Sequence, residues 1–200
     1  MVAAHQRSLF AGGEPALARA PVFERVVLDA TSWIDLARSW LLGTDALLDS
    51  LIESVTWHQG RRRMYDRTLD DPRLSCWFRD RDALPHPVAS TARAALESRY
   101  GVQLGAVGLN YYRDGRDSVA FHRDRELREL DDTLIAIVTL GARRPFHVRP
   151  RGGGTSLDLA PGSGDLLVMG GACQQQFEHG VPKVACCGPR ISMTWRWASS

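Results

Sequence analysis

From residue 102 onward, the sequence consists of short β-branched or aromatic runs that are separated by Gly, Asp and Pro. Examples are VGLNYY, TLIAIVTLG, GDLLVMGG and RISMTWRW. About eight such runs follow one another with too few residues between them for crossover helices, which predicts antiparallel pairing. Strands that are this short and this closely spaced form two-sheet sandwiches or barrels. We therefore expect a double-sheet β core over residues 102–197.

Two stretches before this core have the spacing of amphipathic helices. In residues 44–57, apolar side chains recur every three or four positions, and Thr44 or Asp45 is available to cap the start. Residues 87–101 open with proline and close with glycine, as helices commonly do. The predicted fold class is therefore α+β, with N-terminal helices followed by the β core.

The length of the chain fits one domain. It has 200 residues, of which 44% are hydrophobic, enough for one buried core and short for two. We treat residues 1–200 as a single domain in which residues 1–22, rich in Ala, Gly and Pro, form an extension. No apolar run approaches the ~18 residues of a membrane span, and the first residues lack the apolar core of a signal peptide. We expect a cytoplasmic protein without a membrane partner.

Neither the cysteines nor the net charge identifies a partner. The four cysteines form no C-x-x-C pair, which argues against a zinc knuckle or a disulfide framework. The net charge is +2, and the basic residues are 24 arginines and one lysine. A codon preference for arginine explains that count at least as well as a nucleic-acid partner does.

Residues 57–86 combine clustered arginines with aromatic side chains. Three arginines are consecutive at 61–63, and the aromatic residues Tyr65, Trp77 and Phe78 lie among further arginines. Cations that pair with phosphates and rings that stack on bases make a surface for single-stranded nucleic acid. The same rings could instead anchor a loop to the core. The segment is a candidate substrate lid.

A histidine and an aspartate stand two residues apart in FHRDRE. If the preceding strand runs into a loop here, His122 and Asp124 leave the same face and can share one ion. Among the other histidines, His179 is the best third ligand, because a strand is expected to end at Gly180, near the mouth of the sandwich. Two imidazoles and one carboxylate leave three positions open on Fe(II) for an organic acid and O₂. A solvated His-Arg-Asp turn is the alternative.

Alternation in RISMTWRW separates a polar face from an apolar one. The polar face carries Arg190, Ser192, Thr194 and Arg196. Arginine binds carboxylates through two parallel, charge-assisted hydrogen bonds. This face therefore predicts a buried anion site, with a solvent-facing strand as the alternative.

A set of motifs occurs in order between residues 110 and 196. They are N-x-Y (Asn110, Tyr112), H-x-D-x-E (His122, Asp124, Glu126), T-L-G (Thr139 to Gly141), R-x-F (Arg144, Phe146), GDLLVM, the distal His179, and R-x-S-x-T-x-R (Arg190 to Arg196). Together they resemble the AlkB family of Fe(II)- and 2-oxoglutarate-dependent dioxygenases. The resemblance covers residues 57–197, and it implies a double-stranded β-helix, or jelly roll, with a nucleotide-recognition lid at 57–86.

By position, the resemblance makes His122, Asp124 and His179 the Fe(II) ligands, and it assigns Arg190 to the distal carboxylate of 2-oxoglutarate. The remaining residues of the implied 2-oxoglutarate site are Asn110, Tyr112, Ser192, Thr194 and Arg196. Arg196 lies about 20 Å from Arg190 along an ideal strand, so we expect it near the metal-side carboxylate. Ser192 stands where the family usually has asparagine, and it offers fewer hydrogen bonds.

Glu126 is the first candidate for recognition of a substrate. It lies two residues beyond Asp124, so on an extended segment it shares the ligand face and lies farther out. There its carboxylate can accept hydrogen bonds from the exocyclic amine of a cationic methylated adenine or cytosine. An exposed ion pair with Arg123 or Arg128 is the alternative. The other candidate substrate-binding residues are Arg144, Tyr65, Trp77 and Phe78.

The implied activity is oxidative demethylation of alkylated nucleobases in DNA or RNA, of the 1-methyladenine and 3-methylcytosine type. It consumes O₂ and 2-oxoglutarate and releases formaldehyde, succinate and CO₂. A duplex base is out of reach unless it is flipped, so the expected partner is single-stranded nucleic acid or a flipped base. We expect a monomer. The alternatives are a protein or small-molecule hydroxylase on the same scaffold and a nucleic-acid-binding relative without turnover. A zinc hydrolase would leave the two arginines unexplained.

Overall fold

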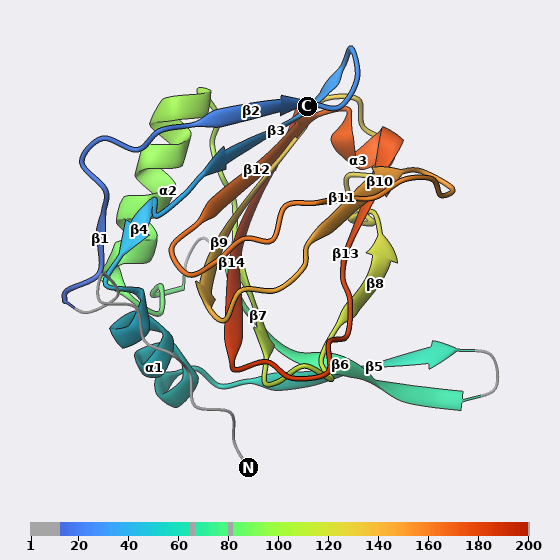
Figure 1. Cartoon of the computed structure of the whole chain (residues 1–200). Coiled ribbons are helices and arrows are strands. Elements are labelled where there is room, and N and C mark those ends of the chain that lie inside the picture. Colours follow the sequence, from blue (N-terminus) through green and yellow to red (C-terminus); the bar gives the residue numbers. More distant parts are fainter. Residues whose placement is uncertain (1–12, 65–66, 80–81, 200) are drawn as a thin grey trace.

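An antiparallel sheet forms the centre of the computed structural model, which describes residues 13–64, 67–79 and 82–199 (Figure 1). Within these residues the sheet has eight strands, in which every recorded pair is antiparallel. In spatial order they are β2 (Glu24–Val27), β3 (Ser32–Ala37), β12 (Leu166–Gly171), β9 (Thr133–Gly141), β14 (Arg190–Ala198), β7 (Val107–Tyr112), β6 (Arg67–Phe78) and β5 (His58–Met64). We call it the major sheet.

A smaller sheet faces the major one. Its four strands are β11 (Leu157–Asp158), β10 (His147–Pro150), β13 (Phe177–Val181) and β8 (Val119–His122). A separate short pair is formed by β1 (Ala16–Leu17) and β4 (Leu41–Leu42). Two facing antiparallel sheets with these connections form a jelly roll, which confirms the predicted architecture.

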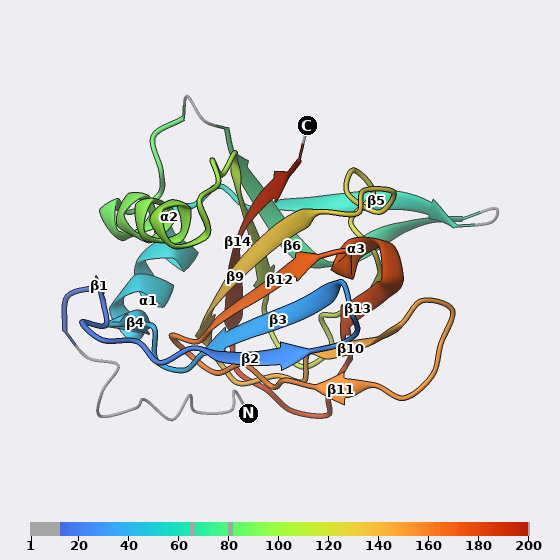
Figure 2. The ribbon, with the colours of Figure 1, turned by 90° about the horizontal axis from the view of Figure 1, so that it is seen from above.

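The major sheet is covered on both faces. Helices α1 (Thr44–Ser54) and α2 (Pro87–Tyr100) lie on one side of it, and the minor sheet lies on the other (Figure 2). One hydrophobic core fills the space under the helices, and a second one lies between the sheets. Strand β9 is buried along its whole length because both cores contact it.

Strand β14 divides its side chains between these two spaces as its alternation predicts. Ile191, Met193 and Trp195 belong to the core under the helices. Arg190 and Ser192, which are also buried, line a cavity on the opposite face. The polar face of RISMTWRW is therefore enclosed between the sheets, and the solvent-facing alternative is wrong.

The two helices lie where the periodicity predicts them, and their ends differ in how they are capped. The N-cap of α2 is His86, whose side chain accepts a hydrogen bond from the amide of Val88, and Pro87 opens the helix. Gly101 ends it with a φ of 68°, which glycine adopts without strain. The predicted Thr44 or Asp45 cap of α1 is wrong, because the N-cap is Gly43 and no side chain caps it.

Three segments differ from the predicted arrangement. Strands β2 and β3 extend the major sheet at its edge, beyond β12, so the chain does not begin with helices alone. The lid region opens with a β-hairpin, β5 paired with β6, that projects from the major sheet (Figure 1). Within the predicted β core, Cys173–Gln176 form a helical turn, α3, that precedes β13. Among the described residues, no helix is long and apolar enough to cross a membrane.

Candidate metal and cofactor site

The three predicted metal ligands converge between the sheets. His122 ends β8 and pairs across the minor sheet with His179 of β13. Asp124 follows β8 by two residues, and one ligand atom from each residue lies within 4.8 Å of the others. Asp124 and His179 are buried, whereas the His122 side chain is 36% exposed. The group is therefore closed on the protein side and accessible from the cavity, as an open metal site requires.

Neighbouring groups fix the orientation of these side chains. The Nδ1 of His122 lies 3.0 Å from the carbonyl oxygen of Ala120, which can only accept a hydrogen bond. The proton therefore stays on Nδ1, and the lone pair of Nε2 is free for a metal. Gln174, which is buried, accepts a 2.9 Å hydrogen bond from the amide of Asp124. The ring of Phe146 stacks on His179 with centroids 5.6 Å apart.

The electrostatics of the group favour the protonation states that bind metal. Burial opposes ionisation of Asp124, but the contact with His122, whose Nε2 lies 3.4 Å from Oδ1, and the charge of Arg196 outweigh it and hold the pKa of Asp124 below its usual range. Burial, together with the neighbouring His122, lowers the pKa of His179 to about 3. At neutral pH this leaves a carboxylate and a neutral imidazole, which are the ligand forms that Fe(II) requires.

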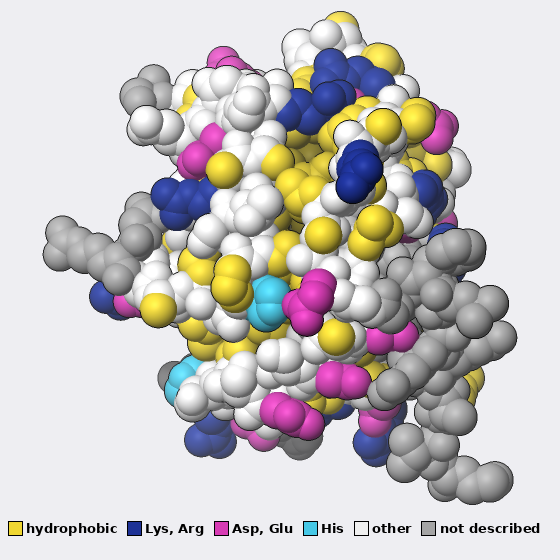
Figure 3. Space-filling model, turned by 90° about the vertical axis from the view of Figure 1, so that its left-hand side faces the viewer, with side chains coloured by type: hydrophobic (Ala, Val, Ile, Leu, Met, Phe, Trp, Pro, Cys, Tyr) yellow, Lys and Arg dark blue, Asp and Glu magenta, His cyan; other side chains and the backbone are white. Residues whose placement is uncertain are grey.

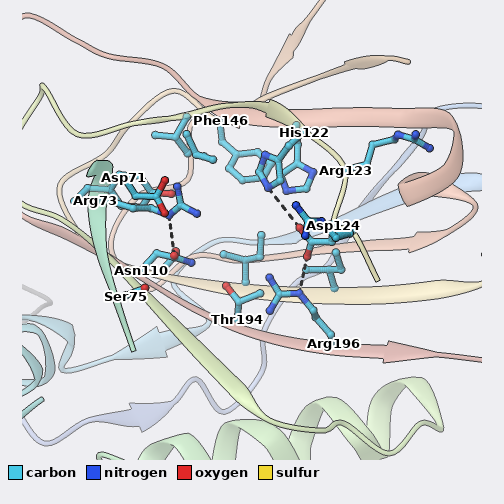
Figure 4. Close-up of a pocket in the computed structure, with 18 of the residues that line it drawn as sticks. Asp71, Arg73, Ser75, Asn110, His122, Arg123, Asp124, Phe146, Thr194 and Arg196 are labelled. Atoms are coloured by element: carbon cyan, nitrogen blue, oxygen red, sulfur yellow. Dashed lines mark hydrogen bonds and ion pairs between the residues drawn. The ribbon is translucent and has the colours of Figure 1, made fainter. Parts of the chain in front are cut away.

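A cavity of about 480 Å³ opens in front of the triad (Figure 4). Its polar lining includes Arg73, Ser75, Asn110, Tyr112, Arg123, Arg125, Glu126, Arg190, Ser192, Thr194 and Arg196. All the residues that were predicted to bind 2-oxoglutarate thus line the same cavity as the triad.

The end of the cavity at Arg190 fits a carboxylate. The Arg190 side chain is 1% exposed, and its Nη2 donates to Oγ1 of Thr139 at 3.2 Å. Its Nε and Nη1 have no hydrogen-bond partner among the described residues. Burial lowers the pKa of Arg190, and the neighbouring Tyr112 offsets only part of this effect. A buried guanidinium with two unused donors is the partner that the distal carboxylate of a diacid needs.

Arg196 lies at the other end of β14 and contacts the triad. Its Nε donates to Oδ2 of Asp124 at 2.5 Å, and its guanidinium carbon is 4.9 Å from the centroid of the Trp77 ring. The prediction placed Arg196 near the metal-side carboxylate of the cofactor. In the structure its partner is the carboxylate of the predicted metal ligand itself.

The predicted substrate-binding residues separate into two groups. Trp77 and Glu126 line the cavity and are largely exposed, at 53% and 61%. The segment at Glu126 is a turn, in which the Leu127 amide bonds to the Asp124 carbonyl, and not the extended chain that was predicted. Glu126 nevertheless reaches Arg196, whose Nε lies 3.6 Å from its Oε1. It is paired with neither Arg123 nor Arg128 in the recorded contacts.

Two of the other three candidates, Phe78 and Arg144, do not line the cavity. Phe78 packs against the core under the helices, because neighbouring residues of a strand point to opposite faces and Trp77 takes the cavity face. Arg144 is 1% exposed and donates to the backbone carbonyls of Asp114, Asp117 and Pro182, so it braces loops rather than facing a base. Tyr65 lies outside the described residues.

Two polar residues at the site were not singled out from the sequence. Gln174 holds the backbone of Asp124 from 50 positions away, and Arg73 donates from Nε to Oδ1 of Asn110 at 2.9 Å. Arg73 is one of the further arginines of residues 57–86, which were predicted only as a group. A strict alternation along β6, which puts Arg73, Ser75 and Trp77 on one face, was the available signal.

A jelly roll that holds a His-Asp-His group between its sheets, open on one side, has the architecture of the mononuclear non-haem iron oxygenases. The sequence comparison agrees with this class, since the model of the 2OG-Fe(II) oxygenase superfamily matches residues 44–196. The chain belongs to this superfamily and, within it, to the AlkB family. The buried Arg190 supports the same assignment, because its two unused donors fit a carboxylate of 2-oxoglutarate, the cofactor that the superfamily uses together with Fe(II).

The relatives with similar sequences are members of the AlkB family. The chain is 30% identical to the human alpha-ketoglutarate-dependent dioxygenase alkB homolog 3, over 76% of this chain and 60% of that protein. It is also 30% identical to the human DNA oxidative demethylase ALKBH2, over 70% of this chain and 58% of that protein. The chain thus spans about 60% of the length of these relatives.

Solved structures show the same fold at low sequence identity. The structure of OsALKBH1 superposes with a TM-score of 0.58 and 14% identity, covering 86% of this chain and 99% of that one. A prolyl hydroxylase from Trichoplax adhaerens superposes with a TM-score of 0.56 and 12% identity, covering 78% and 76%. These similarities establish the jelly-roll fold. The substrate is inferred from the chemistry of the residues that line the cavity.

Proposed function

We propose that this protein oxidatively demethylates alkylated nucleobases in DNA or RNA, using Fe(II), O₂ and 2-oxoglutarate. One observation carries the proposal: Arg196 contacts the predicted metal ligand Asp124 and also two exposed groups, the Trp77 ring and the Glu126 carboxylate. An aromatic face and an acceptor carboxylate therefore lie beside the triad, and both line the cavity. This combination suits a flat ring that carries an exocyclic amine.

The residues of this chain have separate tasks in the proposed reaction. His122, Asp124 and His179 hold Fe(II), and Arg190 binds the distal carboxylate of 2-oxoglutarate. Bound Fe(II) and 2-oxoglutarate, with O₂, supply the oxidant that hydroxylates an N-methyl carbon, after which formaldehyde is lost. The protein contributes placement, because the methyl group must lie next to the metal while the ring is held at the cavity mouth.

Base recognition is assigned to Trp77 and Glu126. Stacking on an exposed aromatic ring is worth roughly 1–3 kcal/mol per base and tolerates different bases. The Glu126 carboxylate can accept a hydrogen bond from the exocyclic amine, and its charge favours a cationic ring. Methylation at N1 of adenine or N3 of cytosine gives such a cation, so we propose 1-methyladenine and 3-methylcytosine as substrates.

The nucleic acid is proposed to lie across the cavity mouth and the β5–β6 hairpin. On the face that carries α1 and α2, acidic and basic side chains of the described residues are interspersed with hydrophobic ones (Figure 3). The lining of the cavity instead includes several arginines besides Arg196, among them Arg73, Arg123 and Arg125. Because the base must enter an enclosed cavity, we propose a single strand or a flipped base as the bound form.

Substitution of Glu126 tests this assignment. Glu126→Ala should lower turnover on 1-methyladenine and 3-methylcytosine about tenfold to a hundredfold, the effect of one charge-assisted hydrogen bond. Methylated thymine, which lacks the amine, should be affected much less. Glu129→Ala is the matched control, because Glu129 is an exposed acid in the same turn that pairs with Arg128. Equal losses on both kinds of base would mean that Glu126 does not read the amine.

A protein or small-molecule hydroxylase on the same scaffold is the competing function. It requires the same triad and the same Arg190, so cofactor binding does not separate the two. Stimulation of succinate release does: methylated oligonucleotides should raise it several-fold over the rate without substrate, and unmodified oligonucleotides should not. No stimulation by either kind of oligonucleotide would favour the competing function.

A further inference from the structure

Strand β6 contributes side chains to both ends of the cavity. Arg73, Ser75 and Trp77 all line it, because alternate residues of a strand share a face. Trp77 lies at the open side, with its ring against the guanidinium of Arg196. Arg73 lies four residues away and reaches Asn110 on β7 (Figure 4). The hairpin that is proposed to hold a base thus also touches the predicted cofactor site.

The contact of Arg73 determines how the Asn110 amide is turned. Nε of Arg73 lies 2.9 Å from Oδ1 of Asn110. A guanidinium has donors and no acceptor, so the atom that it contacts must be the amide oxygen. The Nδ2 group of Asn110 therefore points away from Arg73 and is available as a donor to another group.

The position of Asn110 in the major sheet indicates what that group is. Cross-strand pairing aligns Ser75, Asn110, Ser192 and Thr139 in one row over β6, β7, β14 and β9. Thr139, at the end of the row, accepts a hydrogen bond from Arg190. The row therefore passes next to Arg190, the residue assigned to the distal carboxylate of 2-oxoglutarate. At this position the N–H₂ group of an amide can donate a hydrogen bond to the anion, whereas the amide oxygen would repel it.

We propose that Arg73 is a positioning residue for 2-oxoglutarate, which acts by holding the Asn110 amide with its N–H₂ toward the cofactor. Ser192 increases the need for this arrangement, because a hydroxyl has one donor where an amide has two. The inference rests on the proposed use of 2-oxoglutarate and does not depend on the nucleic-acid substrate. It makes the hairpin strand β6 part of the cofactor site.

The test is calorimetric titration of 2-oxoglutarate into Mn(II)-loaded protein, which reads binding without turnover. Arg73→Met should raise the Kd for 2-oxoglutarate about tenfold, and Arg73→Lys should stay close to wild type, because lysine also only donates. Asn110→Ala should weaken binding by a similar factor, and the double variant should be no weaker than Asn110→Ala alone. The affinity for Mn(II) should be the same in all of them.

Arg61→Met is the matched control, since Arg61 is an exposed arginine on the same hairpin that pairs with Asp70. It should leave the Kd for 2-oxoglutarate unchanged. Wild-type affinity in Arg73→Met, or losses that add in the double variant, would overturn the positioning role. Absence of 2-oxoglutarate binding by the wild type would instead overturn the proposed function, so the two failures are distinguishable.

Discussion

Arg196 donates a 2.5 Å hydrogen bond to Asp124, a residue 72 positions earlier in the chain. The bond uses Oδ2 of the carboxylate, while Oδ1 lies 3.4 Å from Nε2 of His122. Arg196 therefore fixes the carboxylate in the orientation that directs one oxygen toward the histidine ligands. A contact of this kind tunes a metal site without binding the metal.

Removing this contact should weaken metal binding. Arg196→Gln should lower the affinity for Mn(II) or Co(II) about tenfold to a hundredfold, as is typical for groups that orient a ligand. Titration of the apoprotein with Co(II), followed by its visible absorption, measures this directly. Arg149→Gln is a suitable control, because Arg149 also pairs with a carboxylate, Glu178, and does not line the cavity. An unchanged Co(II) affinity in Arg196→Gln would show that Asp124 is held by other contacts.

Arg190 should be essential for binding the cofactor. Arg190→Ala should weaken the binding of 2-oxoglutarate by about 2–5 kcal/mol, because the distal carboxylate would be left without its partner in a buried site. Arg190→Lys should recover only part of this loss, since lysine lacks the planar fork. The Kd for 2-oxoglutarate in the presence of Mn(II) checks both. If Arg190→Ala binds normally, the anion site lies elsewhere.

Trp77 should act on the nucleic acid and not on the cofactors. Trp77→Ala should lower the affinity for a methylated single-stranded oligonucleotide by about 1–3 kcal/mol, the value of one stacked base. Its Kd for 2-oxoglutarate should not change. Gly108 offers a second route to the same effect, because a Cβ there would lie 3.0 Å from the Trp77 ring. Gly108→Val should therefore displace the ring and weaken oligonucleotide binding. Fluorescence anisotropy measures the affinity of both variants. Normal binding by both would exclude Trp77 from the interface with the nucleic acid.

Asp117 should make the unfolding free energy depend on pH in the acidic range. Burial opposes its ionisation, but hydrogen bonds from Arg113 prevail and lower the pKa of Asp117 below its ordinary value of 3.8. A carboxyl whose pKa is lower in the folded state stabilises it fully above about pH 4, and this contribution is lost as the pH falls through the folded-state pKa. Asp117→Asn should cost about 1.5–3 kcal/mol of unfolding free energy at pH 7 and less at pH 3. Urea unfolding at the two pH values checks this, and an equal cost at both would refute it.

The metal triad could be predicted because two local patterns coincide in it. His122 and Asp124 share a face near the end of a strand, and His179 stands before a glycine in a second strand. The pairing of His122 with His179 across β8 and β13 is a long-range register, which no spacing in the sequence contains. The ordered motifs of the family supplied that information.

The failures have physical reasons that differ from one another. Phe78 could have been excluded from the sequence, since it cannot share a strand face with Trp77. Strand β3 contains a charged residue, Asp35, which is untypical of a buried strand, and its burial is explained by hydrogen bonds from Arg25 on the paired strand β2 and from the hydroxyl of Tyr100 in α2. Gln174 has no local signal, because its role comes from the fold of a turn 50 residues away.

We propose that this chain couples the oxidation of 2-oxoglutarate to the removal of a methyl group from a base. The most direct test measures succinate, formaldehyde and unmodified base together, in a single-stranded oligonucleotide that contains 1-methyladenine or 3-methylcytosine. With Fe(II) and 2-oxoglutarate the wild type should form formaldehyde and unmodified base in equal amounts, with at least as much succinate, and Asp124→Ala should form none. Succinate release that is never accompanied by loss of the methyl group, on either base, would show that the protein does not demethylate these bases.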